Sequence, residues 1–478
     1  MPIARYTRAL RRWCLPLLIT AALLPLAACE GMDVFGSRQE PSPPAPDVAA
    51  LPREAPPTVT TPEGAAVPGG LPTVPLTPRP EAAPITKVAI LLPLSGPQAG
   101  LGQALLNAAQ IALFSLADDS FALLPVDTRG TPDGAVAAVR TALDDGANLI
   151  LGPVFSAAVA AATPLAREAG VQMVSFSNDR SVAGNGVYVM GFTPETQIGR
   201  ITAFAASRGI RRIAAILPDG TYGDRVEETL RATAAATGVG LADIVRYPVA
   251  DTQTLTPIIR RLANYDARHR LLLEERQKYE GKTDPGSLQA LKQLQHLDTL
   301  GDVDFDAVLI PEGGAALHAI APLLAFYDID PRKVRMLGTT QWDDPSVATE
   351  PSLVGAWFPA APPAARRAFE DIYNKTYGEA PSRIAALAYD ATALAAVLVR
   401  RRGAASRMAA GGRLPPPASP SVVTVDALTA ASGFAGVDGI FRPLPSGLVE
   451  RALAVMEVRN RRFVVVSPAP TSFGAPGN

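Results

Sequence analysis

Short apolar runs alternate with helical stretches along most of this chain, and this alternation is the feature that most limits its fold. Apolar runs at residues 88–92, 121–126 and 149–151 are each followed by a longer segment with helical spacing. A series of this kind predicts a parallel, doubly wound sheet with helices on both faces. Because the alternation starts again at residues 213–217, we expect an α/β protein of two similar lobes that enclose one cleft.

The N-terminus has the three parts of a secretory signal. Arginines at positions 5, 8, 11 and 12 precede a largely apolar run at residues 15–26, which is too short for a bilayer core that needs about 20 residues. The run ends in the letters LAAC at residues 26–29. These resemble a bacterial lipobox, in which the signal is cut before the cysteine and the thiol carries a diacylglycerol. We therefore expect residues 1–28 to be a lipoprotein signal peptide and Cys29 to be lipidated; a simple signal with an incidental cysteine is the alternative.

The mature chain is expected to begin with a tether. Residues 30–85 contain 14 prolines and no helical or alternating apolar period, so residues 29–85 are predicted to be the lipidated cysteine and a disordered, Pro-rich linker. The only other cysteine, Cys14, lies in the signal, so a lipidated mature chain has no disulfide and depends on its core for stability. Under the sorting rule of enteric-bacterial lipoproteins, Glu30 favours the periplasmic face of the outer membrane, with the inner membrane as the alternative.

Charge and motifs exclude several functions. The formal net charge is −1, so no broad electrostatic attraction to nucleic acid or anionic lipid is expected. The only histidines are His269, His296 and His318, and no Ser-His-Asp or Cys-His arrangement, nucleophile elbow, HExxH, CxxC or P-loop pattern occurs. We expect a binding protein and not an enzyme, with no cofactor, metal or nucleic-acid partner, and with membrane contact through the lipid alone.

Six segments follow one another in a definite order. They read VAILLPLSGPQAGLGQALLNAAQIAL, LILGPVFSAAVAAATPLAREAGVQMVSFSND, YVMGFTPETQIGRITAFAASRG, AAILPDGTYGDRVEETL, DAVLIPEGGAALHAIAPLL and GFAGVDGIFRPLPSG. In this order they resemble type 1 periplasmic-binding proteins, the fold of branched-chain amino-acid and amide receptors, over nearly all of residues 87–466. The resemblance implies a two-lobed α/β fold in which the chain crosses between lobes three times, here near Phe192, Trp357 and Phe434.

These crossings predict the domain organisation. A periplasmic-binding-like domain is expected at residues 86–468, followed by a flexible tail at 469–478. Its first lobe would comprise about 86–192 and 357–433, and its second about 193–356 and 434–466, with a helical insertion at 264–301.

Polar residues follow the predicted strands of both lobes, where an open α/β sheet places ligands. They are Ser95, Ser156, Ser177 and Asn178 in the first lobe and Tyr222, Glu312 and Gln341 in the second. For any one of them a turn or cap role is the alternative, and for Ser156 that role is an N-cap. Their expected convergence is what predicts a ligand-binding cleft.

The resemblance assigns roles to some of these positions. In the receptors, the positions that match Ser156, Ser177 and Tyr222 hold the carboxylate and ammonium ends of an amino acid, and a position near Gln341 supplies an acid. A glutamine cannot neutralise an ammonium, so either Glu312 takes this role or the cleft binds another class of ligand.

Residues 264–301 are a charged insertion that predicts a helical hairpin. One helix is expected at about 267–279, and the second carries the leucine stripe Leu288, Leu291, Leu294 and Leu297. These leucines either pack on the first helix or the second lobe, or they dock a partner. A later Pro-rich insertion at 403–421 follows three arginines at 400–402, which are expected to interact with the C-terminus of a helix; we assign this loop no function.

A charged helical insertion in this lobe resembles the penicillin-binding-protein activator family, outer-membrane lipoproteins whose C-terminal domain has this fold. Enteric members add an N-terminal helical-repeat domain where this sequence has only the linker. The resemblance implies a lipid-anchored regulator that binds and activates a bifunctional penicillin-binding protein in peptidoglycan synthesis. The alternative is a solute-binding lipoprotein of an ABC transporter with an amino-acid-like or amide ligand in its cleft.

Overall fold

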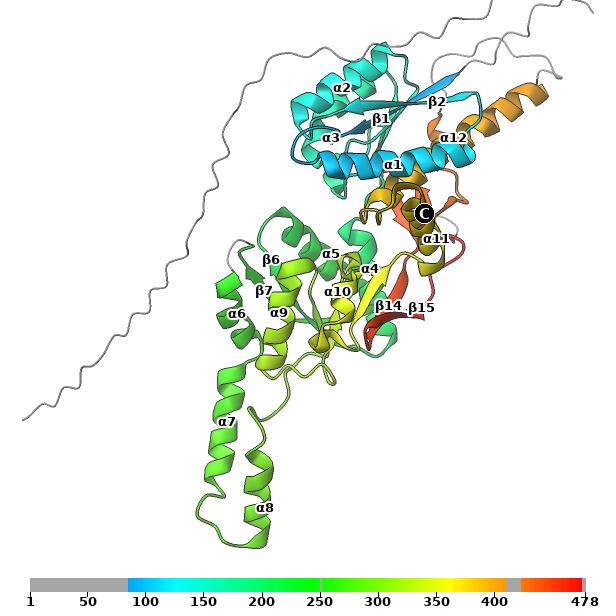
Figure 1. The fold of residues 1–478 in the computed structure, drawn as a ribbon. Coiled ribbons are helices and arrows are strands. Elements are labelled where there is room, and N and C mark those ends of the chain that lie inside the picture. The colour runs from blue at the N-terminus through cyan, green and yellow to red at the C-terminus, as the bar shows by residue number, and fades with distance from the viewer. Residues whose placement is uncertain (1–84, 250–251, 410–422, 475–478) are drawn as a thin grey trace, which may run out of the picture. The chain divides into compact units, whose positions relative to one another are not determined.

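A computed structural model describes residues 85–249, 252–409 and 423–474, the last eight residues of α12 (Ala385–Ala409) by backbone alone (Figure 1). The predicted signal peptide, Cys29 and nearly all of the predicted linker lie outside these residues, as does most of the Pro-rich loop.

The first lobe contains a five-stranded parallel sheet in the order β2-β1-β3-β4-β5. Its strands are β1 (Thr86–Leu92), β2 (Phe121–Asp127), β3 (Leu149–Leu151), β4 (Gln172–Ser175) and β5 (Val187–Val189). Alternate residues of β1 belong to different cores: Val88 and Ile90 pack with the cluster of α1 (Ala99–Leu116) and α12, and Ala89 packs with that of α2 (Pro132–Asp144) and α3 (Ser156–Glu168). Both faces are therefore covered, which explains why the strand is a continuous apolar run.

Helix α1 is long and apolar enough to cross a membrane by length and composition alone. It packs along α12 instead, and Leu105, Ala108 and Ile111 face the first core. Its composition is thus that of a core helix.

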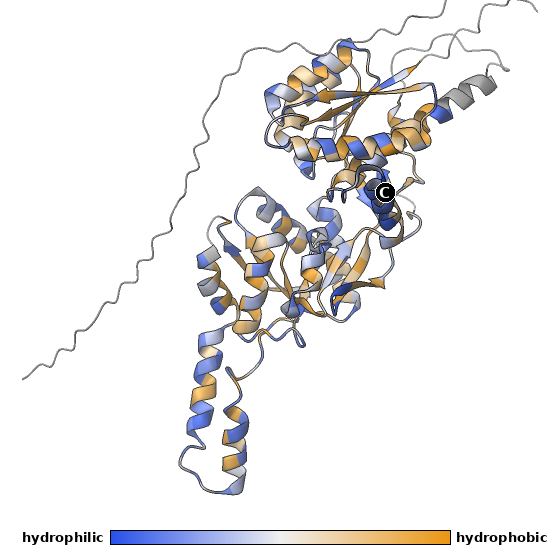
Figure 2. Ribbon diagram, in the orientation of Figure 1, coloured by the Kyte–Doolittle hydropathy of each residue, from blue (hydrophilic) through white to orange (hydrophobic). Residues whose placement is uncertain are grey.

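The second lobe contains a seven-stranded sheet in the order β15-β14-β10-β9-β8-β6-β7. Its strands are β6 (Arg212–Pro218), β7 (Gly240–Tyr247), β8 (Ala307–Leu309), β9 (Arg335–Leu337), β10 (Trp357–Ala360), β14 (Ala454–Arg459) and β15 (Arg462–Ser467). The strands from β6 to β10 are parallel, whereas β14 and β15 are antiparallel additions. The longer covering helices are α4 (Pro194–Ser207), α5 (Thr221–Thr237), α6 (Leu255–Leu262) and α9 (Gly314–Phe326). Figure 2 shows the apolar strands of both sheets.

The remaining elements connect the two lobes or lie at their edges. The helices are α10 (Pro345–Ala348), α11 (Pro363–Tyr377), α13 (Val425–Leu428) and the short 3₁₀ turns Arg180–Val182, Thr252–Thr254, Thr340–Trp342 and Pro351–Leu353. A small antiparallel sheet consists of β11 (Phe434–Gly436), β12 (Gly439–Pro443) and β13 (Val449–Arg451).

The first crossing lies at Phe192, between β5 and α4, where the sequence predicts it. The second and third lie further along the chain than predicted. Trp357 is still in the second sheet, because its indole packs edge-on against Phe204 with ring centroids 5.0 Å apart, so the chain leaves this lobe only after β10. Phe434 begins the small sheet, whose Phe441 packs into the first core, and the second sheet resumes at β14.

Two helices occupy the predicted insertion, α7 (Tyr265–Gln277) and α8 (Pro285–Leu294), which run side by side in Figure 1. The leucine stripe of α8 is divided. Leu291 and Leu294 are half-buried, whereas Leu288 and Leu297 are 53% and 42% exposed. Packing within the hairpin therefore accounts for half of the stripe.

Helix α12 differs from the prediction at its C-terminal end. The arginines at 400–402 were expected near a helix C-terminus, but the helix continues to Ala409. Arg400 still interacts with a helix C-terminus, but that of α1: its Nη1 donates to the carbonyl of Leu116, the last residue of α1 (3.4 Å). The turn-forming prolines that suggested a boundary begin only at Pro415, so seven residues of good helix-forming composition separate the arginines from the end.

Candidate ligand-binding site

Three of the predicted site residues meet at the carboxyl ends of the second sheet. Tyr222 lies in the first turn of α5 after β6, Glu312 follows β8, and Gln341 follows β9. The Tyr222 hydroxyl donates to Pro311 O (3.0 Å), and Gln341 Nε2 donates to the same carbonyl (3.0 Å) and to Tyr222 Oη (3.3 Å). Gln341 therefore positions Tyr222 and the 311 carbonyl.

A fourth residue, Tyr247, belongs to this group and was missed by the sequence analysis. It is the last residue of β7 and is 1% exposed, and its hydroxyl lies beside the Glu312 carboxylate without a hydrogen bond of ordinary geometry to any described residue. Burial, with the nearby Glu312 carboxylate, raises the pKa of Tyr247. Its position at the end of a strand was the signal available, the same signal that identified Glu312 and Gln341.

Burial controls the protonation of this group. It raises the pKa of Tyr222 to about 12 and raises the pKa of the Glu312 carboxyl, an effect that the Tyr247 hydroxyl partly offsets. The tyrosines are therefore neutral donors at physiological pH. A positively charged ligand would favour the ionised form of Glu312, because its charge compensates for the hydration that burial removes from the carboxylate.

The backbone around Glu312 is held by close packing. Trp342 Nε1 donates to Glu312 O (2.7 Å), and a Cβ at Gly313 would stand 2.9 Å from the Gln341 Cβ. A Cβ at Gly223 would stand 1.9 Å from Pro218 O, which requires glycine at the start of α5.

In the first lobe, Ser156 is the first residue of α3. The alternative N-cap role is wrong, because Phe155 occupies the N-cap position and no side chain caps this end. The leading N–H groups of a helix have no partner within the helix. With the Ser156 hydroxyl, this end of α3 provides donors that suit a carboxylate.

The Ser95 and Ser177 side chains make hydrogen bonds that stabilise the backbone around them. Ser95 Oγ donates to Asp127 Oδ2 (2.5 Å), and Asp127 also accepts from the N–H groups of Leu94 and Arg129. Burial alone would raise the pKa of Asp127, but these hydrogen bonds outweigh it and lower the pKa. Ser177 is 3% exposed, and its Oγ accepts from the N–H of Asp179 (3.0 Å).

Asn178 differs from Ser177 in that its side chain is exposed. Of the four residues predicted in the first lobe, Ser95 and Ser177 therefore stabilise the local backbone, while the side chains of Ser156 and Asn178 make no such hydrogen bond within the described residues.

The 339–342 loop is tied to both lobes. The Thr340 N–H and hydroxyl donate to Gln197 Oε1 (2.8 and 2.9 Å), next to the first crossing. Arg383, which precedes α12, donates to Thr340 O. Arg366 of α11 donates to Arg383 O (3.0 Å). A series of hydrogen bonds therefore connects Thr340, the residue beside Gln341, with the segments that join the lobes.

This series of polar contacts ends at a buried group of charged side chains. Arg366 Nη1 pairs with Asp438 Oδ1 at 2.7 Å, and Arg451 Nη2 donates to Met190 O (2.8 Å) at the first crossing. Asp390, Asp438 and Arg451 are 1%, 0% and 5% exposed. Burial, together with Asp438, raises the pKa of Asp390 to about 7, against the opposing effect of Arg451.

No group of three or more potential metal ligands occurs in the part of the chain that the structure describes.

A family model described as periplasmic binding protein matches residues 86–462. The chain belongs to this family. Membership implies a periplasmic protein, and the two-lobed α/β fold is that of the type 1 periplasmic binding proteins. A comparison with curated proteins finds no match.

Solved structures of periplasmic binding proteins are similar over most of this one. A structure assigned to a branched-chain amino acid ABC transporter of Rhodospirillum rubrum has a TM-score of 0.61 at 18% identity and covers 80% of this chain and 100% of its own. A solute binding protein of Rhodopseudomonas palustris in complex with 3,4-dihydroxybenzoic acid has a TM-score of 0.55 at 17% identity, covering 82% and 98%. The isoleucine complex of a branched-chain amino acid transporter substrate binding protein of Streptococcus pneumoniae has a TM-score of 0.52 at 19% identity, covering 80% and 100%.

Proposed function

We propose that this periplasmic binding protein captures a small carboxylate-bearing solute for an ABC transporter, without catalysis and without a cofactor. The observation that carries the proposal is the buried Tyr247 hydroxyl beside the Glu312 carboxylate at the strand ends of the second lobe, which form no hydrogen bond of ordinary geometry with each other. A buried polar group without a partner is costly, and a bound ligand removes that cost. The complexes of similar structures with isoleucine and with 3,4-dihydroxybenzoic acid support this class of ligand.

The two lobes would share the ligand. The free donors at the start of α3, with Ser156, hold its carboxylate. Glu312 and Tyr247 hold its opposite end, an ammonium or hydroxyl group. Closure of the lobes then buries the ligand, as in other hinge-closing binding proteins.

A thermal-shift panel of branched-chain amino acids, amides and hydroxybenzoates tests this function. We expect at least one class to raise the melting temperature by several degrees at saturating concentration. Glu312→Gln should weaken an ammonium ligand by at least about tenfold, equivalent to about 1.4 kcal/mol, but should affect a hydroxybenzoate much less. The matched control is Glu168→Gln, on the exposed end of α3. A flat response to the whole panel would contradict the proposal.

Lipidation of Cys29 and attachment to the periplasmic face of the outer membrane complete the proposal, on the basis of the LAAC motif and Glu30. Metabolic labelling with a fatty acid followed by membrane fractionation tests both. Cys29→Ala should lose the label and release the protein; label retained by this variant would exclude Cys29 as the lipidated residue.

A second candidate function is favoured by the hairpin. Its exposed leucines, Leu271, Leu273, Leu288 and Leu297, would suit docking to a bifunctional penicillin-binding protein and regulation of peptidoglycan synthesis. In a binding assay with that synthase, changing all four to glutamine should abolish binding. The control changes the exposed Phe326, Val354 and Ile372 to glutamine. Equal binding by both variants would exclude docking through the hairpin.

A further inference from the structure

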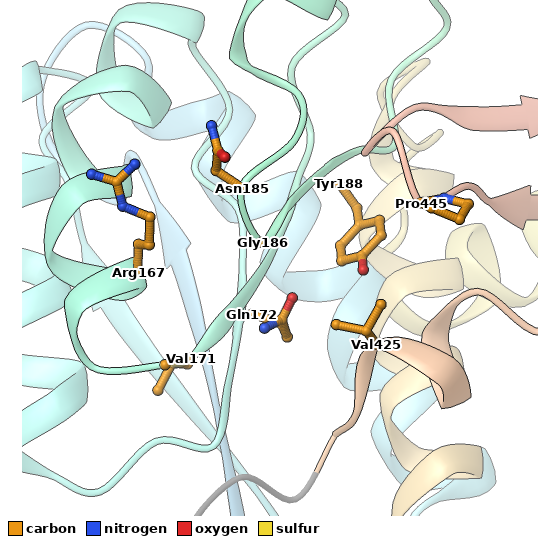
Figure 3. Close-up of a pocket in the computed structure, with 9 residues that line it drawn as sticks. Arg167, Val171, Gln172, Asn185, Gly186, Tyr188, Val425 and Pro445 are labelled. Atoms are coloured by element: carbon orange, nitrogen blue, oxygen red, sulfur yellow. The ribbon is translucent and has the colours of Figure 1, made fainter.

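The first lobe contains a second pocket, far along the strands from the candidate site. A cavity of about 310 Å³ is lined by Gln172 at the start of β4, by Asn185 and Tyr188 around the start of β5, by Arg167 at the end of α3, and by Val425 and Pro445 (Figure 3). Ser177 and Asn178 follow the opposite end of β4. The pocket is therefore at the amino ends of these strands, whereas the candidate site is at their carboxyl ends.

Two side chains of this pocket have polar groups that a ligand could contact. Tyr188 is 3% exposed and lines the pocket. Gln172 Oε1 is buried and has no hydrogen-bond partner among the same residues. A buried oxygen without a partner destabilises the fold, so native proteins rarely leave one unpaired.

The surrounding chain keeps the pocket open above Gln172. Gly186 has φ +87°, a conformation that favours glycine, and a Cβ there would stand 3.4 Å from Gln172 Oε1. The neighbouring Asn185 also has positive φ, +52°. Figure 3 shows the Gln172 amide and the Tyr188 ring in the middle of the pocket, with Arg167 at one side and Val425 near the tyrosine hydroxyl.

The Gln172 oxygen and the Tyr188 hydroxyl define a ligand. A tyrosine hydroxyl donates to a carbonyl, and a glutamine side-chain carbonyl accepts from an N–H. Together they match one amide group. Burial, with the nearby Asp426 carboxylate, raises the pKa of Tyr188, so its hydroxyl stays protonated and able to donate. Arg167 is exposed and makes no ion pair among the described residues, which leaves its guanidinium for a carboxylate.

We propose that this pocket binds a small molecule that combines an amide with a carboxylate, such as an N-acylated amino acid or a dipeptide. Tyr188 donates to the amide carbonyl, Gln172 accepts from the amide N–H, and Arg167 pairs with the carboxylate. Val425 and Pro445 contact the apolar part. A volume of about 310 Å³ equals roughly ten water volumes, which suits a ligand of this size. The proposal is independent of the solute that the candidate site binds.

Titration of the full chain with N-acetylglycine, followed by calorimetry, tests the pocket. Acetate and acetamide are the matched probes that each carry half of the ligand. We expect N-acetylglycine to bind at least tenfold more tightly than either. Tyr188→Phe and Gln172→Met should each weaken binding at least tenfold, and Tyr247→Phe, in the other lobe, should leave it unchanged.

The variants also separate binding from folding. Because Gln172 Oε1 has no partner, Gln172→Met should not lower the melting temperature, so its loss of binding cannot be assigned to unfolding. The proposal is overturned if N-acetylglycine does not bind, if it binds no better than acetate, or if Tyr247→Phe and not Gln172→Met abolishes binding. The last result would assign the ligand to the candidate site instead.

Discussion

Two tyrosines at the candidate site show how much a single hydroxyl group depends on its partners. Tyr222 donates to Pro311 O and accepts from Gln341 Nε2, so its hydroxyl stabilises the empty protein. Tyr247 is more deeply buried, yet its hydroxyl lies beside Glu312 without a hydrogen bond of ordinary geometry to any described residue. The same chemical group therefore has a structural role at one position and is free for a ligand at the other.

We expect the matched hydroxyl deletions to separate these roles. Tyr222→Phe should lower the free energy of unfolding by about 1 kcal/mol, the usual loss for a hydrogen bond. Tyr247→Phe should leave it unchanged or raise it slightly, and should weaken the ligand identified by thermal shift. Urea unfolding without ligand measures the first effect. Equal destabilisation by both changes would mean that Tyr247 has a partner in solution.

At the scale of elements, the helical hairpin is held together by arginines more than by its leucines. Arg276 of α7 donates to Leu294 O at the end of α8 (2.8 Å) and to Leu297 O just beyond it (2.9 Å). Arg268 is 6% exposed and donates to Gly301 O (2.8 Å). These bonds satisfy carbonyls that a helix end and the returning chain leave unpaired.

Arg276→Met should therefore loosen α8 without unfolding the lobe. Charged hydrogen bonds contribute about 1.5–3 kcal/mol, so amide exchange in residues 285–297 should become roughly ten- to a hundredfold faster, while the melting temperature of the main transition stays within about 2 °C. Lys278→Met is the control, because this lysine makes only a surface pair with Glu275. Unchanged exchange in Arg276→Met would show that leucine packing holds α8.

At the scale of the whole molecule, buried charges hold together the segments that join the two lobes. Asp390 lies on α12, Asp438 between β11 and β12, and Arg451 at the end of β13. Asp390 Oδ1 accepts from Val437 N–H (2.8 Å), but Asp390 Oδ2, Asp438 Oδ2 and Arg451 Nη1 lack hydrogen-bond partners among the described residues. Arg366 pairs with Asp438, whereas Asp390 has no ion pair among the described residues, so a proton on Asp390 is favoured.

This group predicts a dependence of stability on pH. The pKa of Asp390 is raised from 3.8 to about 7 in the folded protein, so between about pH 4 and pH 7 the folded state binds more protons than the unfolded state. Its contribution to stability is present at low pH and is lost as pH rises through this window. Asp390→Asn keeps the acceptor for Val437 N–H and should remove this loss, making the protein more stable than wild type at pH 8.

Guanidinium unfolding at pH 5, 6, 7 and 8 measures the difference. The expected gain at pH 8 is about 1–3 kcal/mol, the cost of an imperfectly compensated buried polar group. Asp371→Asn, on the exposed face of α11, is the control and should follow wild type. If the free energy of unfolding of Asp390→Asn changes with pH in parallel with that of wild type, Asp390 is ionised throughout this range.

The prediction of the site succeeded where a residue follows a strand and failed where contacts depend on a partner far along the chain. The positions of Tyr222, Glu312 and Gln341 after strands were read from local periodicity. Tyr247 was missed, because what marks it as a site residue is its proximity to Glu312, and only the order of the strands in the sheet brings the two residues together. The use of Ser95 in its own loop depends on Asp127, across from it at the end of β2.

By itself the sequence determined the order of strands and helices, the two similar lobes, the first crossing and the helical nature of the insertion. These follow from hydrophobic spacing and turn residues, which act over a few residues. Only the tertiary structure decided the later crossings, the pairing of Arg366 with Asp438, the surroundings of the Tyr247 hydroxyl, and the pocket at Gln172. Each depends on which strands pair, in which register, and on how buried groups compete for hydrogen-bond partners, and packing of the whole lobe decides these together.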